Sequence, residues 1–249
     1  MLILLPPSET KRAGGRARPL DLASLALPSL LPQRERVADA LVALAQDPDA
    51  AARVLKLSER QRGEIDDNRA LHTAATMPAV DRYTGVLYDA LDAPTLPAPA
   101  RRWLGGHVLI HSAPFGPVGA LDAIPAYRLA AGVSLPQLPA LRAVWADAVT
   151  QALAAAKPRL VLDLRSEAYA ALGPVPAGIG SAYLRVVTRG EDGTTRALNH
   201  FNKHAKGALV RELALARPRL GTVDAVTAWA ASVGLELRAG APGELDLVV

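Results

Sequence analysis

Residues 1–11 read MLILLPPSETK, and they predict a sheet strand followed at once by a polar loop. Residues 2–5 form a short apolar run, and the Pro-Pro pair ends it because proline cannot donate a hydrogen bond to a sheet ladder. Ser8, Thr10 and Lys11 come directly afterwards. A buried strand that ends in hydroxyls and an amine is typical of the edge of an α/β sheet where ligands bind.

Further apolar runs of this kind alternate with helical patterns along the chain. The runs are HVLIH (107–111), RLVLDL (159–164) and YLRVVT (183–188). Apolar residues recur at helical spacing over residues 37–44, 141–153 and 205–213. This alternation predicts an α/β (α+β) fold, with a mixed, mainly parallel sheet covered by helices in one compact domain over residues 1–249.

The C-terminal quarter repeats the alternation. Thr222 is a plausible N-cap for a helix over residues 223–233, and Gly234 suits its C-cap. LELR (235–238) and LDLVV (245–249) then predict two closing strands.

The composition excludes several classes of protein. None of the 249 residues is cysteine, which excludes disulfides, Fe–S clusters, Cys-based zinc sites and thiol redox chemistry. The net charge of +4 indicates nucleic-acid binding only if the basic residues cluster. GxGxxG, P-loop and GxSxG motifs are missing, and we expect no bound cofactor. The sequence shows neither a signal peptide nor a membrane-spanning run, so we expect a cytoplasmic protein without membrane contact.

Polar side chains follow three of the predicted strands. Ser112 follows the strand at 107–111, while Asp163, Arg165 and Ser166 lie in and after the strand at 159–164. If these strands are parallel neighbours of the first one, their loops share one crevice, where Lys11, Arg165 and the hydroxyls would bind an anion such as phosphate. The alternative is that the hydroxyls cap helices and the charges are solvated.

Two segments are rich in tyrosine. YTGVLYD (83–89) carries Tyr83 and Tyr88, and DAIPAYRL (122–129) carries Asp122, Tyr127 and Arg128. Aromatic rings beside basic residues can stack on nucleic-acid bases, and they can equally form an internal packing layer.

The strongest basic cluster is NHFNKHAKG (199–207), with Lys203 and Lys206. Near a helix N-terminus it would face a polyanion, and the alternative is a solvated helix start. His200 and His204 have the i, i+4 spacing of a metal pair, but no third ligand accompanies them. His107 and His111 would lie about 13 Å apart in a strand, too far for one ion. We therefore expect no metal site.

Six segments in this order resemble the peroxide stress protein YaaA family, over essentially the whole chain. They are LILLPPSETK (2–11), YTGVLYDALDA (83–93), HSAPFGPVGALDAIPAYRL (111–129), the helical pattern around Trp145, LDLRSEAYAAL (162–172) and NHFNKHAKGALVREL (199–213). The resemblance implies a single α/β body in the bacterial cytoplasm and a role in the response to hydrogen peroxide by limiting free intracellular iron. It also implies DNA binding, through a helix-hairpin-helix-like element and a positively charged cleft.

The same resemblance implies which residues bind DNA or another anion. They are Ser8, Thr10, Lys11, Tyr83, Tyr88, Ser112, Asp122, Tyr127, Arg128, Asp163, Arg165, Ser166, Lys203 and Lys206. Further positions that match the family's motifs are Gly85, Gly116, Pro125, Tyr169 and Gly207.

These observations support three hypotheses of function. The first is non-specific binding of double-stranded DNA by a basic cleft, with the protective effect indirect because the chain has no cysteine and two methionines. The second is an enzyme or nucleotide-binding protein with a polar cleft around Lys11, Arg128 and Arg165, where Asp163 or Glu167 would be a general base. The third is weak iron binding through carboxylates and histidines.

Overall fold

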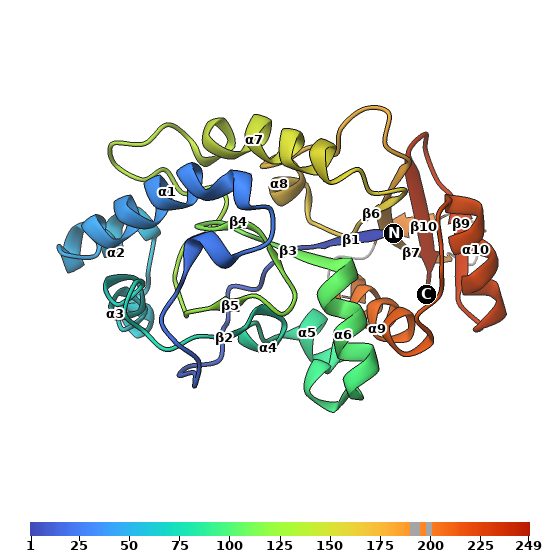
Figure 1. Ribbon diagram of the computed structural model, residues 1–249, viewed down its shortest axis with the longest axis horizontal. Coiled ribbons are helices and arrows are strands. Elements are labelled where there is room, and N and C mark those ends of the chain that lie inside the picture. Colours follow the sequence, from blue (N-terminus) through green and yellow to red (C-terminus); the bar gives the residue numbers. More distant parts are fainter. Residues whose placement is uncertain (190–194, 198–200) are drawn as a thin grey trace.

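A mixed sheet runs through the centre of the computed structural model, which describes residues 1–189, 195–197 and 201–249 (Figure 1). The strand order is β4-β3-β1-β6-β7-β10-β9, and β8 pairs with β7. The strands are β1 (Leu2–Leu5), β3 (Val108–Ser112), β4 (Gly116–Gly119), β6 (Val161–Asp163), β7 (Ser181–Arg189), β8 (Thr195–Ala197), β9 (Glu236–Ala239) and β10 (Glu244–Val248). The five strands from β3 to β10 are parallel, while β4, β8 and β9 pair antiparallel to their neighbours.

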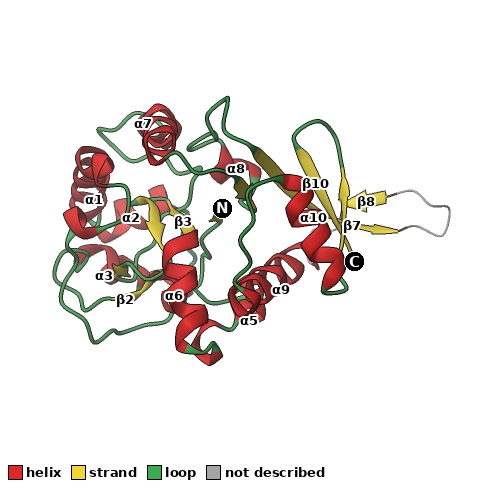
Figure 2. Ribbon diagram, turned by 45° about the vertical axis from the view of Figure 1, so that its right-hand side comes forward, coloured by secondary structure: helices red, strands yellow, loops and turns green. Residues whose placement is uncertain are grey.

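Helices cover both faces of this sheet. The helices are α1 (Leu31–Leu44), α2 (Pro48–Leu55), α3 (Glu64–Arg69), α4 (Ala79–Arg82), α5 (Val86–Leu91), α6 (Ala98–His107), α7 (Leu141–Ala156), α8 (Glu167–Ala170), α9 (Phe201–Ala216) and α10 (Val223–Ser232). In Figures 1 and 2, α7 lies on one side of the central strands, and α5, α6 and α9 lie on the other. A small second sheet pairs β2 (Met77–Pro78) with β5 (Ala123–Ile124).

The predicted mainly parallel α/β arrangement is therefore confirmed. In β1, Ile3, Leu4 and Leu5 are at most 1% exposed, since helices on both faces shield a parallel sheet from water. This double burial explains why the strand is a continuous apolar run. One hydrophobic cluster includes both Leu4 and Leu247, so the two ends of the chain share a core.

The helical predictions are also confirmed. Val37, Leu41 and Leu44 are buried in α1. The Thr222 hydroxyl accepts a hydrogen bond from the Ala225 N–H at the start of α10. Gly234 follows that helix with a φ of 78°, a conformation that glycine adopts without a steric penalty.

The strand predicted from residue 107 begins one residue later, at Val108. His107 ends α6 and does not begin a strand, because its ring stacks on Trp103 with centroids 4.3 Å apart. His111 lies in β3 and is 1% exposed. The two histidines thus belong to different elements. In the part of the chain that the structure describes, no helix is long and apolar enough to cross a membrane.

Candidate functional site

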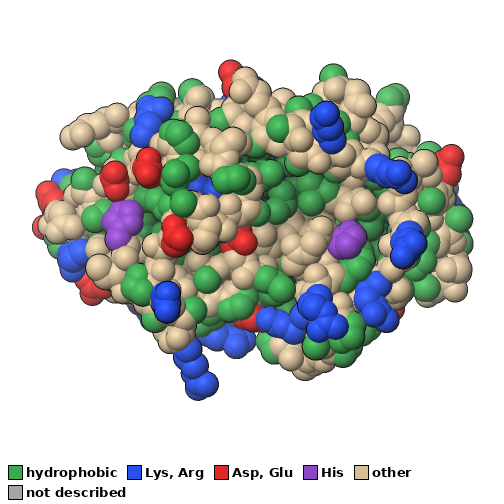
Figure 3. Space-filling model, in the orientation of Figure 1, with side chains coloured by type: hydrophobic (Ala, Val, Ile, Leu, Met, Phe, Trp, Pro, Cys, Tyr) green, Lys and Arg blue, Asp and Glu red, His purple; other side chains and the backbone are tan. Residues whose placement is uncertain are grey.

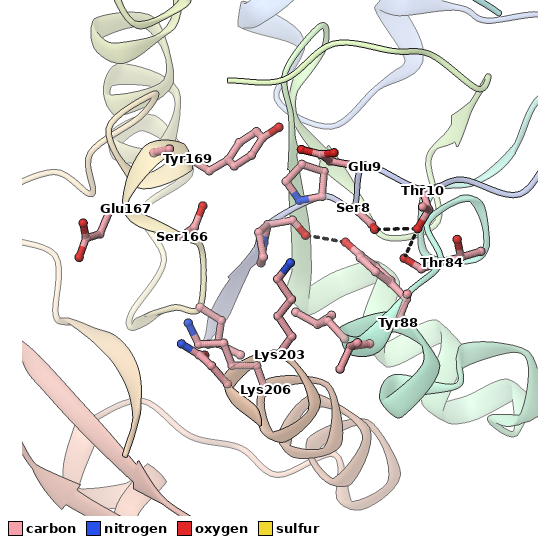
Figure 4. Close-up of a pocket in the computed structure, with 18 of the residues that line it drawn as sticks. Ser8, Glu9, Thr10, Thr84, Tyr88, Ser166, Glu167, Tyr169, Lys203 and Lys206 are labelled. Atoms are coloured by element: carbon pink, nitrogen blue, oxygen red, sulfur yellow. Dashed lines mark hydrogen bonds between the residues drawn. The ribbon is translucent and has the colours of Figure 1, made fainter. Parts of the chain in front are cut away.

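A pocket of about 830 Å³ lies beyond the carboxyl ends of β1 and β6 (Figure 4). These strands are parallel neighbours, with Leu4 opposite Asp163, so the loops that follow them converge. The pocket is lined by residues 6–10, 84–88, Leu164, 166–169, Tyr183, Asn202, Lys203 and Lys206. Segments far apart in the sequence therefore meet at one site.

Hydroxyl groups form one wall of the pocket. The Oγ atoms of Ser8 and Thr10 are 3.2 Å apart, and Thr10 donates a hydrogen bond of 3.3 Å to the carbonyl of Thr84. Gly85 has a φ of 95°, and a Cβ at this position would lie 3.3 Å from both hydroxyls. The Tyr88 hydroxyl donates to the carbonyl of Pro6 at 2.7 Å. These bonds hold the loop after β1 against the start of α5.

Asn202, Lys203 and Lys206 form the opposite wall, here named the α9 wall. Figure 4 shows both lysines rising from α9 toward the space that Ser8 and Ser166 border. A Cβ at Gly207 would overlap the carbonyl of Leu87, so the glycine permits the close contact of α9 with α5. This contact fixes the position of the α9 wall.

Lys206 is a buried lysine of the α9 wall. Its side chain is 5% exposed, and its Nζ lies 5.7 Å from the ring centroid of Tyr183. It makes no hydrogen bond or ion pair with any residue in the described ranges. Burial lowers the pKa of Lys206 to about 8, although the charge of Asp163 opposes this shift. Lys203, one turn earlier on α9, is exposed.

Asp163 already has its own counterion. Arg165 donates hydrogen bonds of 2.8 Å and 2.7 Å to the two oxygens of Asp163, and the arginine side chain is fully buried. Arg165 also donates to Nδ1 of His111 at 2.8 Å, while burial and this cation hold the pKa of His111 well below its usual value. Asp163 and Arg165 line a smaller cavity of about 350 Å³ and not the main pocket.

A tyrosine layer lies next to the pocket, comprising Tyr83, Tyr88 and Tyr127 with Lys11 and Ser112. The three rings are at most 5% exposed. The hydroxyls of Tyr83 and Tyr127 are 2.8 Å apart, and Ser112 donates to Tyr127 at 3.1 Å. The structure thus shows an internal packing layer. Of its three tyrosines, only Tyr88 also lines the pocket.

Lys11 is the cation of the tyrosine layer. Its Nζ donates to the carbonyls of Ser8 and Glu9, both at 3.1 Å, and lies 4.1 Å from the ring centroid of Tyr127. Burial, and to a smaller extent the charge of Arg128, lower the pKa of Lys11 to about 7. The amine is satisfied by backbone groups and does not line the pocket.

The remaining predicted residues hold loops in place. Arg128 pairs with Glu9 and Glu64, each at 3.3 Å. The carboxylate of Asp122 accepts hydrogen bonds from the backbone N–H groups of Gly119 and Ala26, both at 2.7 Å.

The structure therefore divides the predicted set. Ser8, Thr10, Gly85, Tyr88, Ser166, Tyr169, Lys203 and Lys206 line the pocket, and Lys11, Tyr83, Ser112, Asp122, Tyr127, Arg128, Asp163 and Arg165 lie outside its wall. Of the five cations proposed to hold DNA, Lys203 alone is exposed. His200 lies outside the described residues, and in the described part no group of three His, Asp or Glu residues is placed to hold a metal ion.

Sequence reasoning did not single out four polar lining residues, Glu9, Thr84, Tyr183 and Asn202. Glu9 stands inside the first quoted motif. Thr84 and Asn202 stand inside the motifs that it quoted, while Tyr183 was visible as the first residue of a predicted strand. The Oδ1 atom of Asn202 is buried and has no hydrogen-bond partner among the described residues. The α9 wall thus offers an unused acceptor beside an unpaired amine.

Comparison with known proteins places the chain in a family. The model of the peroxide stress protein YaaA family matches residues 1–239. UPF0246 protein Cgl1995/cg2186 of Corynebacterium glutamicum is 45% identical over 94% of each chain. UPF0246 protein CE1889 of Corynebacterium efficiens is 46% identical over the full length of both, and UPF0246 protein SCO2297 of Streptomyces coelicolor is 45% identical over 98% of this chain and 94% of its own. The chain belongs to the peroxide stress protein YaaA family, as the six ordered motifs predicted.

Proposed function

We propose that this protein serves the response to hydrogen peroxide by binding a small anionic molecule in the pocket between the loop after β1 and the α9 wall. The observation that carries the proposal is Lys206, a cation that is 5% exposed, lines the pocket and forms no ion pair with a residue that the structure describes. We place this activity in the cytoplasm.

Electrostatics favours an anion as the ligand. An unpaired buried charge is unfavourable, and Arg165 already occupies both oxygens of Asp163, the nearby carboxylate. A phosphate or carboxylate in the pocket would supply the missing negative charge. Lys203 at the rim and the hydroxyls of Ser8 and Ser166 are further donors on the pocket wall.

The pocket also carries acidic groups, which restrict the ligand. Glu9 and Glu167 line it and are exposed. A ligand that presents hydroxyl or amino groups to these carboxylates and an anionic group to Lys206 would match both charges. Nucleoside monophosphates have this combination.

Non-specific binding of double-stranded DNA is the second candidate. The loop that continues from Thr10 carries exposed Arg12, Arg16 and Arg18. Figure 3 shows Lys and Arg side chains gathered at the lower right, over α6 and α9. These side chains could contact DNA phosphates without contacting the bases, so such binding would not depend on sequence. That a helix-hairpin-helix-like element makes such contacts with DNA stays a prediction.

An effect on free iron would be indirect in either case. The chain has no cysteine, so we propose that lower iron levels and protected DNA follow from ligand or DNA binding and not from thiol chemistry.

Thermal shift and calorimetry test the first candidate with inorganic phosphate and AMP. A ligand at ten times its dissociation constant stabilises the folded state by about 1.4 kcal/mol, which raises Tm by a few degrees. Lys206→Gln should remove this shift. Lys157→Gln is the matched control, because Lys157 is exposed and precedes β6 at the opposite end of the strands. An equal shift in both variants, or none in the wild type, would refute the pocket proposal.

Fluorescence anisotropy with a duplex of roughly 20 base pairs tests the second candidate. Binding should weaken steeply between about 50 and 200 mM salt, and the triple change of Arg12, Arg16 and Arg18 to Gln should reduce the salt slope. Absence of a complex at the lower salt concentration would contradict DNA binding and leave the pocket proposal standing.

A further inference from the structure

We infer that Lys206 is a nucleophilic amine that forms a covalent imine with an aldehyde or ketone carrying a phosphate or carboxylate group. This inference rests on the proposed function, because the anionic group of such a ligand would bind in the same pocket.

Comparison of the five lysines singles out Lys206. All five lie in the described ranges: Lys11, Lys56, Lys157, Lys203 and Lys206. Lys56, Lys157 and Lys203 are exposed, while Lys11 is outside the pocket wall. Lys206 alone combines burial with a place on the pocket wall.

The contacts of the Lys206 amine differ from those of the partly buried Lys11 amine. Lys11 donates to two backbone carbonyls, so its lone pair would become available only after those bonds break. Lys206 has no such partner among the described residues, and Asp163 is bound to Arg165. The Lys206 amine is therefore free to turn toward a ligand.

Burial also makes Lys206 reactive near neutral pH. An amine attacks a carbonyl only in its unprotonated form. With a pKa of about 8, about a quarter of Lys206 is unprotonated at pH 7.5, compared with about one part in a thousand for a lysine of ordinary pKa. Carboxylates and phenols share the pocket with Lys206, namely Glu9, Tyr88, Glu167, Tyr169 and Tyr183, and Asp163 acts on it from β6.

The reaction is balanced without an oxidant or reductant. The lone pair of Nζ attacks the carbonyl carbon, and the π electrons move to oxygen, which takes up a proton. Nitrogen then loses a proton, the hydroxyl leaves as water after protonation, and a C=N bond remains. Glu167 of α8, which also lines the pocket, is the proposed carrier of these protons.

The surroundings define the ligand class. The ring of Tyr183 near Nζ, with Leu87 and Leu164, forms the apolar part of the wall and would shield the C=N bond from water. Lys203 and Ser166 offer donors for the anionic end. A carbonyl compound with one anionic group fits the volume of about 830 Å³.

Reductive trapping tests the inference directly. The protein is incubated at pH 7.5 with glycolaldehyde phosphate and sodium cyanoborohydride, and modified peptides are mapped by mass spectrometry. We expect modification at Lys206 at least about tenfold above that at Lys56 or Lys157 at early times. Inorganic phosphate should slow the reaction at Lys206 and leave the exposed lysines unchanged, a measurement that needs no variant.

Two controls separate this inference from the proposed function. Lys206→Arg keeps the charge, so it should still bind phosphate but lose the adduct, whereas Lys157→Arg, at an exposed lysine outside the pocket, should keep both. Propanal, which has no anionic group, should react with Lys206 more slowly than glycolaldehyde phosphate does. Phosphate binding without an adduct at Lys206 would overturn the imine and leave the anion site intact. Modification spread evenly over Lys56, Lys157 and the terminal amine of Met1 would overturn it too, while equal rates for both aldehydes would count against the anion site alone.

Discussion

The tyrosine layer contains a partly buried lysine and the α9 wall a buried one, and the contacts of the two amines differ. In the tyrosine layer, Lys11 donates to two carbonyls and lies over the ring of Tyr127. In the α9 wall, Lys206 lies 5.7 Å from the ring centroid of Tyr183, lines the pocket and makes no hydrogen bond or ion pair with a described residue. Burial lowers the pKa of both amines. The comparison teaches that burial lowers the pKa of a lysine both where its amine is hydrogen-bonded and where its amine has no hydrogen bond to a described residue.

Of the changes considered, removal of the Arg165 side chain should have the largest effect on stability, and it should also give Lys206 a counterion. Arg165→Ala leaves Asp163 buried without its counterion, which should lower the free energy of unfolding by about 3–5 kcal/mol. Asp163 would then pair with Lys206, so the trapping rate at Lys206 should fall. Urea unfolding measures the first effect. Arg185→Ala at the exposed pair with Glu244 is the control, with an expected loss below about 1 kcal/mol. Equal losses in the two variants would contradict the assigned role of the buried pair.

A side chain at Gly207 should disturb the α9 wall and spare the tyrosine layer. In Gly207→Ala, the new Cβ would overlap the carbonyl of Leu87, so α9 must move away from α5. We expect a loss of about 1–3 kcal/mol in the free energy of unfolding and weaker phosphate binding. Gly106→Ala, where a Cβ meets no atom within 4 Å, is the control on α6. Unchanged phosphate affinity in Gly207→Ala would show that the helix contact does not position the lysines.

Lys11 and Lys206 should also contribute differently to the pH dependence of the free energy of unfolding, and this effect should be smaller. Because both pKa values are lowered in the folded state, to about 7 and about 8, the unfolded chain binds more protons above those values. Stability therefore rises with pH from about 7 toward 10. Lys206→Met should remove about 1–2 kcal/mol of the rise between pH 7 and 9.5, and Lys11→Met should remove the part that begins near pH 7. Urea unfolding across this range measures both, and a rise left intact by either variant would contradict the corresponding shift.

Much of the fold was predictable because its signals are local. The apolar run of β1, the helical spacing of α1 and the Thr222 cap each depend on neighbours in the sequence. The convergence of Ser8 and Ser166 was also predictable, since parallel strands place their carboxyl ends at one edge. His107 was misassigned because a stacking contact with Trp103 extends α6 by one residue beyond the apolar pattern.

The partners of the charged residues were not predictable. Lys11, Arg165 and Lys206 all stand in quoted motifs, and the sequence treats them as equivalent cations. Whether each one is satisfied depends on groups far away in the chain, such as His111 for Arg165.

The sequence by itself determined the family, the mainly parallel α/β sheet and the strand ends that border the pocket, because apolar periodicity and ordered motifs are properties of the chain. The tertiary structure alone decided which lysine is left unpaired at the pocket. Burial and hydrogen bonding are set by contacts between distant segments, here the docking of α9 on α5 and the pairing of Arg165 with Asp163.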